Sequence, residues 1–237
     1  MFQQMLALEP HSLKAMVCVA SALTDLASAS YRGGLDQNTS ERQFQEGHAL
    51  ALKASALGAT HQWIYEVQAI CARYHDDQPG WLENSKAWQQ ADPDDLVPLL
   101  YIANASIYGG DLQNALTLVR QAIDMDRTPP NWGELAILGK IYFLRDDDAR
   151  AIAALQQARA VTPNNGAVYA YLAMANFSKG DEAAAHATVA ELRNQQPQYT
   201  FKIFSRAEGP MPTTSPVYKS WWETKLIPAW RHAGLPE

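Results

Sequence analysis

Two stretches of the chain, FLRDDDARAIAALQQARAVTP and FSKGDEAAAHATVAELRNQQP, repeat one pattern at a spacing of 34 residues. Each begins with Phe, has a basic residue two positions later, passes through a turn into an Ala-rich run and ends in Pro. A shift by one period places Phe143 on Phe177 and Ala151 on Ala185. Such a period indicates a repeat protein, in which each unit covers its apolar face only by stacking on the next unit.

Small residues recur at two places in each unit and predict pairs of closely packed helices. In the clearest unit these residues are Gly139 in the first half and Ala151 in the second. Large side chains there would force the two helices apart. The equivalent pairs in the neighbouring units are Ala103 with Ala115, and Ala173 with Ala185.

The pattern resembles the tetratricopeptide repeat, W-x2-L-G-x2-Y … A-x3-F … P. Leu135 replaces the Trp, Leu138-Gly139 and Tyr142 are kept, and Pro163 closes the unit. The resemblance implies an all-α fold, a TPR-type α-solenoid in which antiparallel helix pairs form a right-handed superhelix. It covers residues 1–197, as a partial repeat at 1–10 followed by about five repeats.

The N-terminal part departs from a regular array in two ways. FQQMLALEP, ending at Pro10, lines up with LQQARAVTP, ending at Pro163, so the chain opens in the second helix of a repeat. We therefore expect a tail end of a longer protein or a piece cut from one. An insertion is predicted near residues 30–40, as a loop from Tyr31 to Thr39 that is either functional or surface decoration. Ser40 and Gln43 then predict a capping box that opens the next helix.

Residues 198–237 are predicted to form a Pro-rich connection, EGPMPTTSP, and a C-terminal capping helix. Tyr218, Trp222, Leu226 and Trp230 fall four apart, which predicts one apolar stripe that covers the last repeat. Pro228 lies inside this pattern and predicts a kink or a split in the helix.

A narrower resemblance concerns the segment RTPPNWGELAILGKIYFLRDDDARAIAALQQA and the ending LIPAWRHAGLPE. Both are similar to the C-terminal repeat region of bacterial class III adenylate or guanylate cyclases and of related winged-helix signalling regulators. The resemblance implies a regulatory or docking module of a bacterial signalling protein. A cyclase domain itself would need a strand-rich segment, and the sequence offers none.

Charge and composition argue against several classes of partner. The net charge is −6 with scattered Lys and Arg, which disfavours nucleic acid and anionic membranes as partners. No apolar run approaches the roughly 18 residues that span a bilayer, and the N-terminus lacks the pattern of a secretory signal. We expect a cytoplasmic protein in which Cys18 and Cys71 are buried free thiols, with a disulfide as the alternative.

No motif predicts catalysis, a cofactor or a metal. The six histidines show neither HExxH nor His-x3-His spacing. Asp146, Asp147 and Asp148 are interpreted as the cap of a second helix rather than a Mg²⁺ site. The chain itself is therefore predicted not to be an enzyme.

The predicted binding surface is the concave groove lined by first helices, and its ligand is a protein or peptide. The alternative for Phe143 and Phe177 is core packing against the next repeat. The chain is expected to be a monomer or weak dimer. Two other functions stay open: the non-catalytic region of a larger adenylate cyclase-type enzyme, and a self-association scaffold. The candidate groove residues are Arg73, Asn104, Ile107, Lys140, Phe143, Met174 and Phe177.

Overall fold

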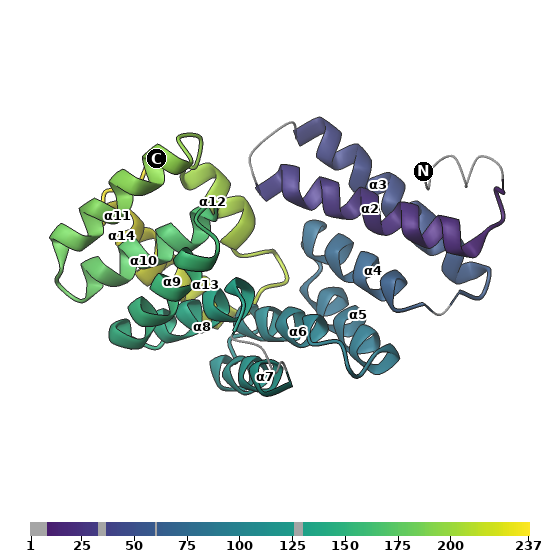
Figure 1. Cartoon of the computed structure of the whole chain (residues 1–237), viewed down its shortest axis with the longest axis horizontal. Helices are drawn as coiled ribbons and strands as arrows, with labels where there is room; N and C mark the ends of the chain where they lie inside the picture. The colour runs from purple at the N-terminus through teal and green to yellow at the C-terminus, as the bar shows by residue number, and fades with distance from the viewer. Residues whose placement is uncertain (1–8, 33–36, 60, 126–129) are drawn as a thin grey trace. The chain divides into compact units, whose positions relative to one another are not determined.

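A computed structural model of the chain describes residues 9–32, 37–59, 61–125 and 130–237, and every regular element in these ranges is a helix (Figure 1). The prediction of an all-α fold built from antiparallel helix pairs is confirmed. The pairs are α2 (Leu13–Arg32) with α3 (Gln37–Ala56), α4 (Gln62–Tyr74) with α5 (Gln78–Ala91), α6 (Val97–Tyr108) with α7 (Leu112–Met125), α8 (Trp132–Leu144) with α9 (Asp148–Val161), and α10 (Gly166–Ser178) with α11 (Glu182–Gln195). They are followed by α12 (Phe201–Glu208), α13 (Pro216–Trp221), the π-helical turn η1 (Trp222–Leu226) and α14 (Ile227–His232).

The chain folds as two compact units. The first comprises Met1–Tyr101 with Met211–Thr213, and the second comprises Ile102–Pro210 with Thr214–Glu237. The boundary between them falls inside α6, between Tyr101 and Ile102. The sequence-based division into a solenoid of residues 1–197 and a cap of residues 198–237 stays a prediction.

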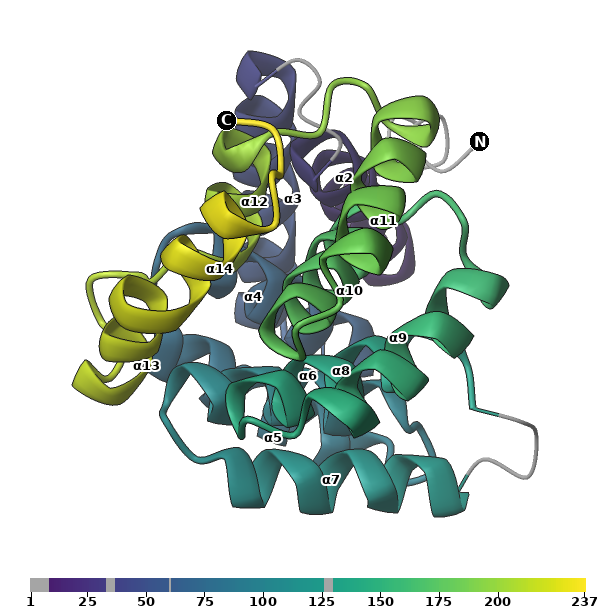
Figure 2. The ribbon, with the colours of Figure 1, turned by 90° about the vertical axis from the view of Figure 1, so that its left-hand side faces the viewer.

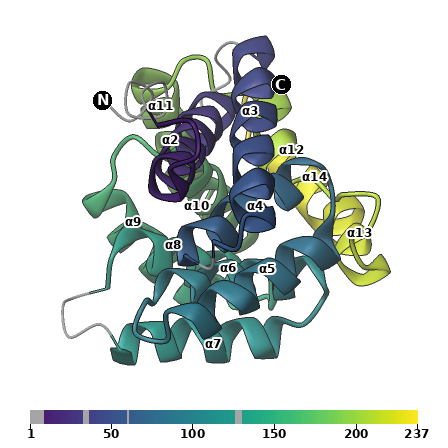
Figure 3. The same cartoon turned by 90° about the vertical axis from the view of Figure 1, so that its right-hand side faces the viewer.

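In the first unit, α2, α3 and α4 lie together (Figure 3), and their buried apolar side chains form one core. Gly47 lets α3 approach α2 closely, because a Cβ there would lie 2.9 Å from Cγ2 of Thr24. Trp81 and Trp88 of α5 are buried, as their spacing of seven predicts. The cysteines, Cys18 and Cys71, are buried and free.

The predicted insertion near residues 30–40 is helical at both ends. Helix α2 continues to Arg32 and α3 begins at Gln37, so the predicted loop is wrong at its two ends. Ser40 lies inside α3 and therefore does not cap it, which corrects the predicted capping box. The partial repeat at residues 1–10 falls mostly outside the described residues.

The second unit repeats one cap at the start of each second helix. Asp111 Oδ1 accepts a hydrogen bond from the backbone N–H of Asn114 at 2.9 Å, and Asp181 Oδ1 accepts one from Ala184 at 3.0 Å. Asp147 does the same for α9, whose N-cap it is. The interpretation of the Asp146–Asp148 run as a helix cap is thus confirmed for Asp147, while Asp148 is the first residue of α9.

The C-terminal segment of the second unit consists of α12, α13, η1 and α14 (Figure 2). Ile227 donates its backbone N–H to the carbonyl of Trp222, five residues earlier, which is the π-helical pattern. Pro228 follows at once and has no N–H to offer, so the helix changes its hydrogen-bond period there rather than ending. The stripe predicted by the fourfold spacing is buried: Tyr218, Trp222, Leu226 and Trp230.

Candidate binding face of the second unit

The C-terminal segment packs on the first helices of the second unit, α6, α8 and α10. Its Tyr218 ring stacks on Tyr108 of α6, with centroids 4.4 Å apart. Helix α14 packs on α10, beside which it lies in Figure 2. Sequence interpretation placed the stripe on the last repeat alone, whereas the structure places the segment along three first helices. We call the surface it covers the first-helix face.

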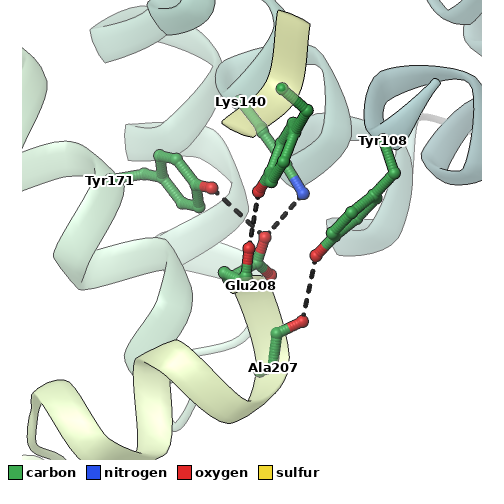
Figure 4. A network of polar contacts seen from close by, with 6 residues as sticks. Tyr108, Lys140, Tyr171, Ala207 and Glu208 are labelled. Atoms are coloured by element: carbon green, nitrogen blue, oxygen red, sulfur yellow. Dashed lines mark hydrogen bonds and ion pairs between the residues drawn. The ribbon is translucent and has the colours of Figure 1, made fainter. Parts of the chain in front are cut away.

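A buried ion pair joins the first-helix face to the end of α12 (Figure 4). The Nζ of Lys140 on α8 lies 2.5 Å from Oε2 of Glu208, and the two side chains are 5% and 17% exposed. Tyr171 of α10 donates its hydroxyl to the same carboxylate oxygen at 3.2 Å. The ammonium also lies 4.6 Å from the ring centroid of Tyr108 and 5.8 Å from that of Tyr218. One carboxylate thus meets a cation and a neutral donor inside an aromatic enclosure.

Two tyrosines satisfy backbone carbonyls at the C-terminal end of α12. The hydroxyl of Tyr108 donates to the carbonyl of Ala207 at 3.1 Å, and that of Tyr218 donates to the carbonyl of Glu208 at 2.6 Å. The last carbonyls of a helix have no partner within the helix, so these bonds stabilise the end of α12. Figure 4 shows the bond from Tyr108 beside the Lys140–Glu208 pair.

Burial keeps the hydroxyl of Tyr171, the neutral donor of this network, protonated. It raises the pKa of the Tyr171 phenol well above its ordinary value, and the charge of Glu208 raises it further. Tyr171 therefore remains a hydrogen-bond donor throughout the physiological pH range. The partly buried carboxylate of Glu208 thus faces a neutral donor and an ammonium, which offset its desolvation.

A second lysine joins the segment to the loop after α8. Lys225 Nζ lies 2.5 Å from Oδ1 of Asp146 and donates to the carbonyl of Phe143. The ammonium also lies 4.7 Å from the centroid of the Phe143 ring. Asp146 adopts a φ of +60°, a conformation rare for residues other than glycine. It lies in the turn between α8 and α9, which presents its carboxylate to Lys225.

The structure places the seven predicted groove residues in three environments. Ile107, Phe143 and Met174 are fully buried, and Lys140 is 4% exposed. Asn104 and Phe177 are partly exposed, and Phe177 packs against His232. Arg73 belongs to the first unit, where its guanidinium lies 5.4 Å from the centroid of the Trp81 ring. Binding of a partner by any of the seven stays a prediction.

Sequence reasoning missed α12 and with it Glu208. The helix has eight residues, FKIFSRAE, and buries only Ile203 and Phe204. A run of this length gives too few turns for a helical period to be recognised. The sequence did offer one signal: the apolar pair Ile203–Phe204 is followed by Glu208, four residues after Phe204.

Among the described residues, two features bear on small-molecule or metal binding. No group of three or more His, Cys, Asp or Glu side chains among them could hold a metal ion. A cavity of about 200 Å³ lies among α9, α10 and α11, next to an ion pair of 2.9 Å between Arg159 and Glu191. Pockets for drug-sized ligands start at about 300 Å³. Within the described ranges, no helix has the length and apolar character to cross a membrane.

Comparisons with known proteins agree with the helix-pair architecture. No protein-family model matches the chain, and no curated protein matches it significantly. Among solved structures, a thermophilic TPR protein of Thermus thermophilus is similar at a TM-score of 0.61 and 18% identity, over 79% of this chain and 96% of that one. PilW, a type IV pilus biogenesis factor, is similar at a TM-score of 0.61 and 15% identity, over 91% of this chain and 89% of that one.

A third solved structure extends the match along nearly the whole chain. A tetratricopeptide repeat protein of Parabacteroides merdae is similar at a TM-score of 0.59 and 13% identity, over 98% of this chain and 83% of that one. At such identities the likeness establishes the fold and nothing finer. The chain therefore has the fold of tetratricopeptide repeat proteins.

Proposed function

We propose that the chain is a non-catalytic protein–protein interaction scaffold whose first helices bind a segment of a partner protein. One observation carries this proposal: the first-helix face of the second unit holds the helix α12 through the Tyr171–Phe204 ring contact and the Lys140–Glu208 pair. A wall of stacked helices with these residues is thus able to grip a helical segment, which is the helix-in-groove mode of recognition.

We propose a separate partner surface on each unit, made by the accessible parts of its own first helices. In the second unit Asn104 is partly exposed. In the first unit Arg73 is partly exposed, and Trp63 on the same helix is 40% exposed. Amide, guanidinium and indole groups orient a peptide and supply contact area. Ile107, Lys140, Phe143 and Met174 act from beneath, by shaping the wall, and Phe177 acts at its edge.

The setting that we propose is the cytoplasm of a bacterial cell, as the C-terminal part of a signalling protein. The resemblance to cyclase-associated repeat regions and the two free buried thiols support it. In one alternative, the chain is the non-catalytic region of an adenylate cyclase-type enzyme; the gene upstream of Met1 decides this. In the other, the chain self-associates; light scattering across a concentration series decides that.

Site-specific photo-crosslinking in the source cells tests the scaffold function. A photoreactive residue at position 73 or 104 should capture a partner protein. The matched controls are positions 90 and 121, which are exposed glutamines on the second helices α5 and α7. Equal capture from the control positions, or none from positions 73 and 104, would count against binding by the first helices.

A further inference from the structure

We propose that α12 is a built-in ligand of the second unit. We further propose that the same site accepts a partner helix carrying an aromatic residue followed by a glutamate four positions later. The inference rests on the proposed scaffold function and names the chemistry of its partner. It assigns Lys140 and Tyr171 as the carboxylate-binding part of the site.

The two residues of the recognised pattern lie on one face of α12. Phe204 and Glu208 are four residues apart, so they lie on the same side of the helix, one turn from each other. Phe204 is fully buried, with its ring centroid 5.7 Å from that of Tyr171. Glu208 meets Lys140 on the neighbouring helix of the wall. An aromatic anchor and a carboxylate therefore mark the two ends of one helical turn.

The groups around the carboxylate belong to the wall, whereas Phe204 also packs on Trp222 and Trp230 of the C-terminal segment. Lys140 comes from α8, Tyr171 from α10 and Tyr108 from α6. An ammonium and a neutral phenol both donate hydrogen bonds, so the site fits an acceptor with a negative charge. A glutamine would present an NH₂ group and no charge, which leaves the buried ammonium without its counter-ion. The site thus discriminates between a carboxylate and an amide of the same shape.

The chain connections on either side of α12 are not helical, although the rings of Phe201 and Phe204 pack on Trp222 and Trp230. A non-helical connection separates Gln195, the end of α11, from Phe201, and the N-cap Thr200 makes no side-chain cap bond. After Glu208, the prolines at positions 210, 212 and 216 prevent a continuous helix into α13. Release of α12 therefore breaks its contacts with Trp222 and Trp230 but does not require α11 or α13 to unwind. While tethered it competes with any partner at a high effective concentration, in the millimolar range for short flexible linkers.

A complementation experiment on the full chain tests the proposal. The probe is a fluorescent synthetic peptide that copies residues 199–210, YTFKIFSRAEGP, and the matched probe has glutamine in place of its glutamate. The wild-type chain should bind both probes weakly, because its own Glu208 fills the site. The Glu208→Gln chain should bind the glutamate probe at least about tenfold more tightly, since one charged hydrogen-bonded contact is regained. The glutamine probe should gain nothing, and the further change Lys140→Met should abolish the gain.

Folded Glu208→Gln protein that binds the glutamate probe no more tightly than wild type would overturn the proposal. So would an equal gain for both probes. If that variant does not fold, hydrogen exchange on the wild-type chain decides. The amides of α12 should then exchange at least about tenfold faster than those of α8 and α10, by local opening, and equal protection would contradict an exchangeable ligand. Crosslinking from positions 73 and 104 is independent of these results, so the scaffold function can survive the failure of this inference.

Discussion

Gly139 of α8 lies directly against the side chain of Leu155 of α9: a Cβ at position 139 would be 2.3 Å from Cγ of Leu155. This is closer than two non-bonded carbon atoms can approach, so the contact exists only because residue 139 has no side chain. It is the contact that the small residues of the repeat predict. The two helices of this hairpin therefore owe their close packing to one glycine and to the leucine that fills the space above it.

Gly139→Ala is expected to destabilise the protein although alanine is the better helix former. Helix propensity alone would favour alanine by about 1 kcal/mol, whereas overpacking typically costs about 1–3 kcal/mol. We expect a net loss in the free energy of unfolding, measured by urea denaturation. In a Leu155→Ala background the same change should become neutral or stabilising, because the clash is gone. A loss of the same size in both backgrounds would show that Leu155 is not the cause.

The sequence predicted the repeats of the second unit well because their signals are local. Gly139, the Asp147 cap and the buried alanines each follow from the spacing within one hairpin. A period of 34 residues repeats these signals, so errors at single positions do not hide them. The same reasoning found the buried stripe from Tyr218 to Trp230.

The part that sequence could not predict depends on contacts between distant residues. Lys140 and Glu208 are 68 positions apart, and nothing local to either residue announces the other. Lys140 was expected to face a ligand because its register places it on the wall, and the register is right. What covers the wall is a matter of tertiary packing, which decides that Met174 is buried rather than open to solvent.

Met174→Glu is expected to unfold the second unit rather than to alter a surface. Met174 is fully buried on α10, so the variant would bury a charge in the core. We expect a loss of about 4 kcal/mol or more in the free energy of unfolding. Ala183→Glu, at an exposed position of α11, is the matched control and should change it little. A folded Met174→Glu protein of wild-type stability would show that this face is open in solution.

Glu66 of the first unit should make stability depend on pH. Burial, and then the charges of Asp25 and Asp95, raise the pKa of the Glu66 carboxyl to about 7. Because the folded-state pKa lies above the unfolded value, the favourable contribution of the proton is complete below about pH 4.5 and is lost as the pH rises through 7. Glu66→Gln stays neutral, so it should raise the melting temperature at pH 8 by about 2–6 °C and hardly change it at pH 4.5.

The control for this effect is Glu83→Gln on α5, where the side chain is exposed. It removes the same formal charge from the same unit, so it reports any general benefit of lowering the negative charge. Thermal melts of both variants between pH 4.5 and 8 provide the comparison. A pH-independent gain for Glu66→Gln, or an equal gain for both variants, would argue against a local origin at Glu66.

Removal of the residues after Pro210 is expected to expose the part of the first-helix face that α13, η1 and α14 cover. The truncation deletes Tyr218, Trp222, Leu226 and Trp230, all of which are buried. Burial of each large apolar side chain is worth about 1.5–3 kcal/mol, and the entropy recovered by the released segment offsets part of this sum. We expect a net loss of several kcal/mol in the free energy of unfolding and new binding of an apolar dye. Arg231→Ala, an exposed change within α14, should have neither effect. A truncated chain that melts at the wild-type temperature would mean that the segment is not part of the folded core.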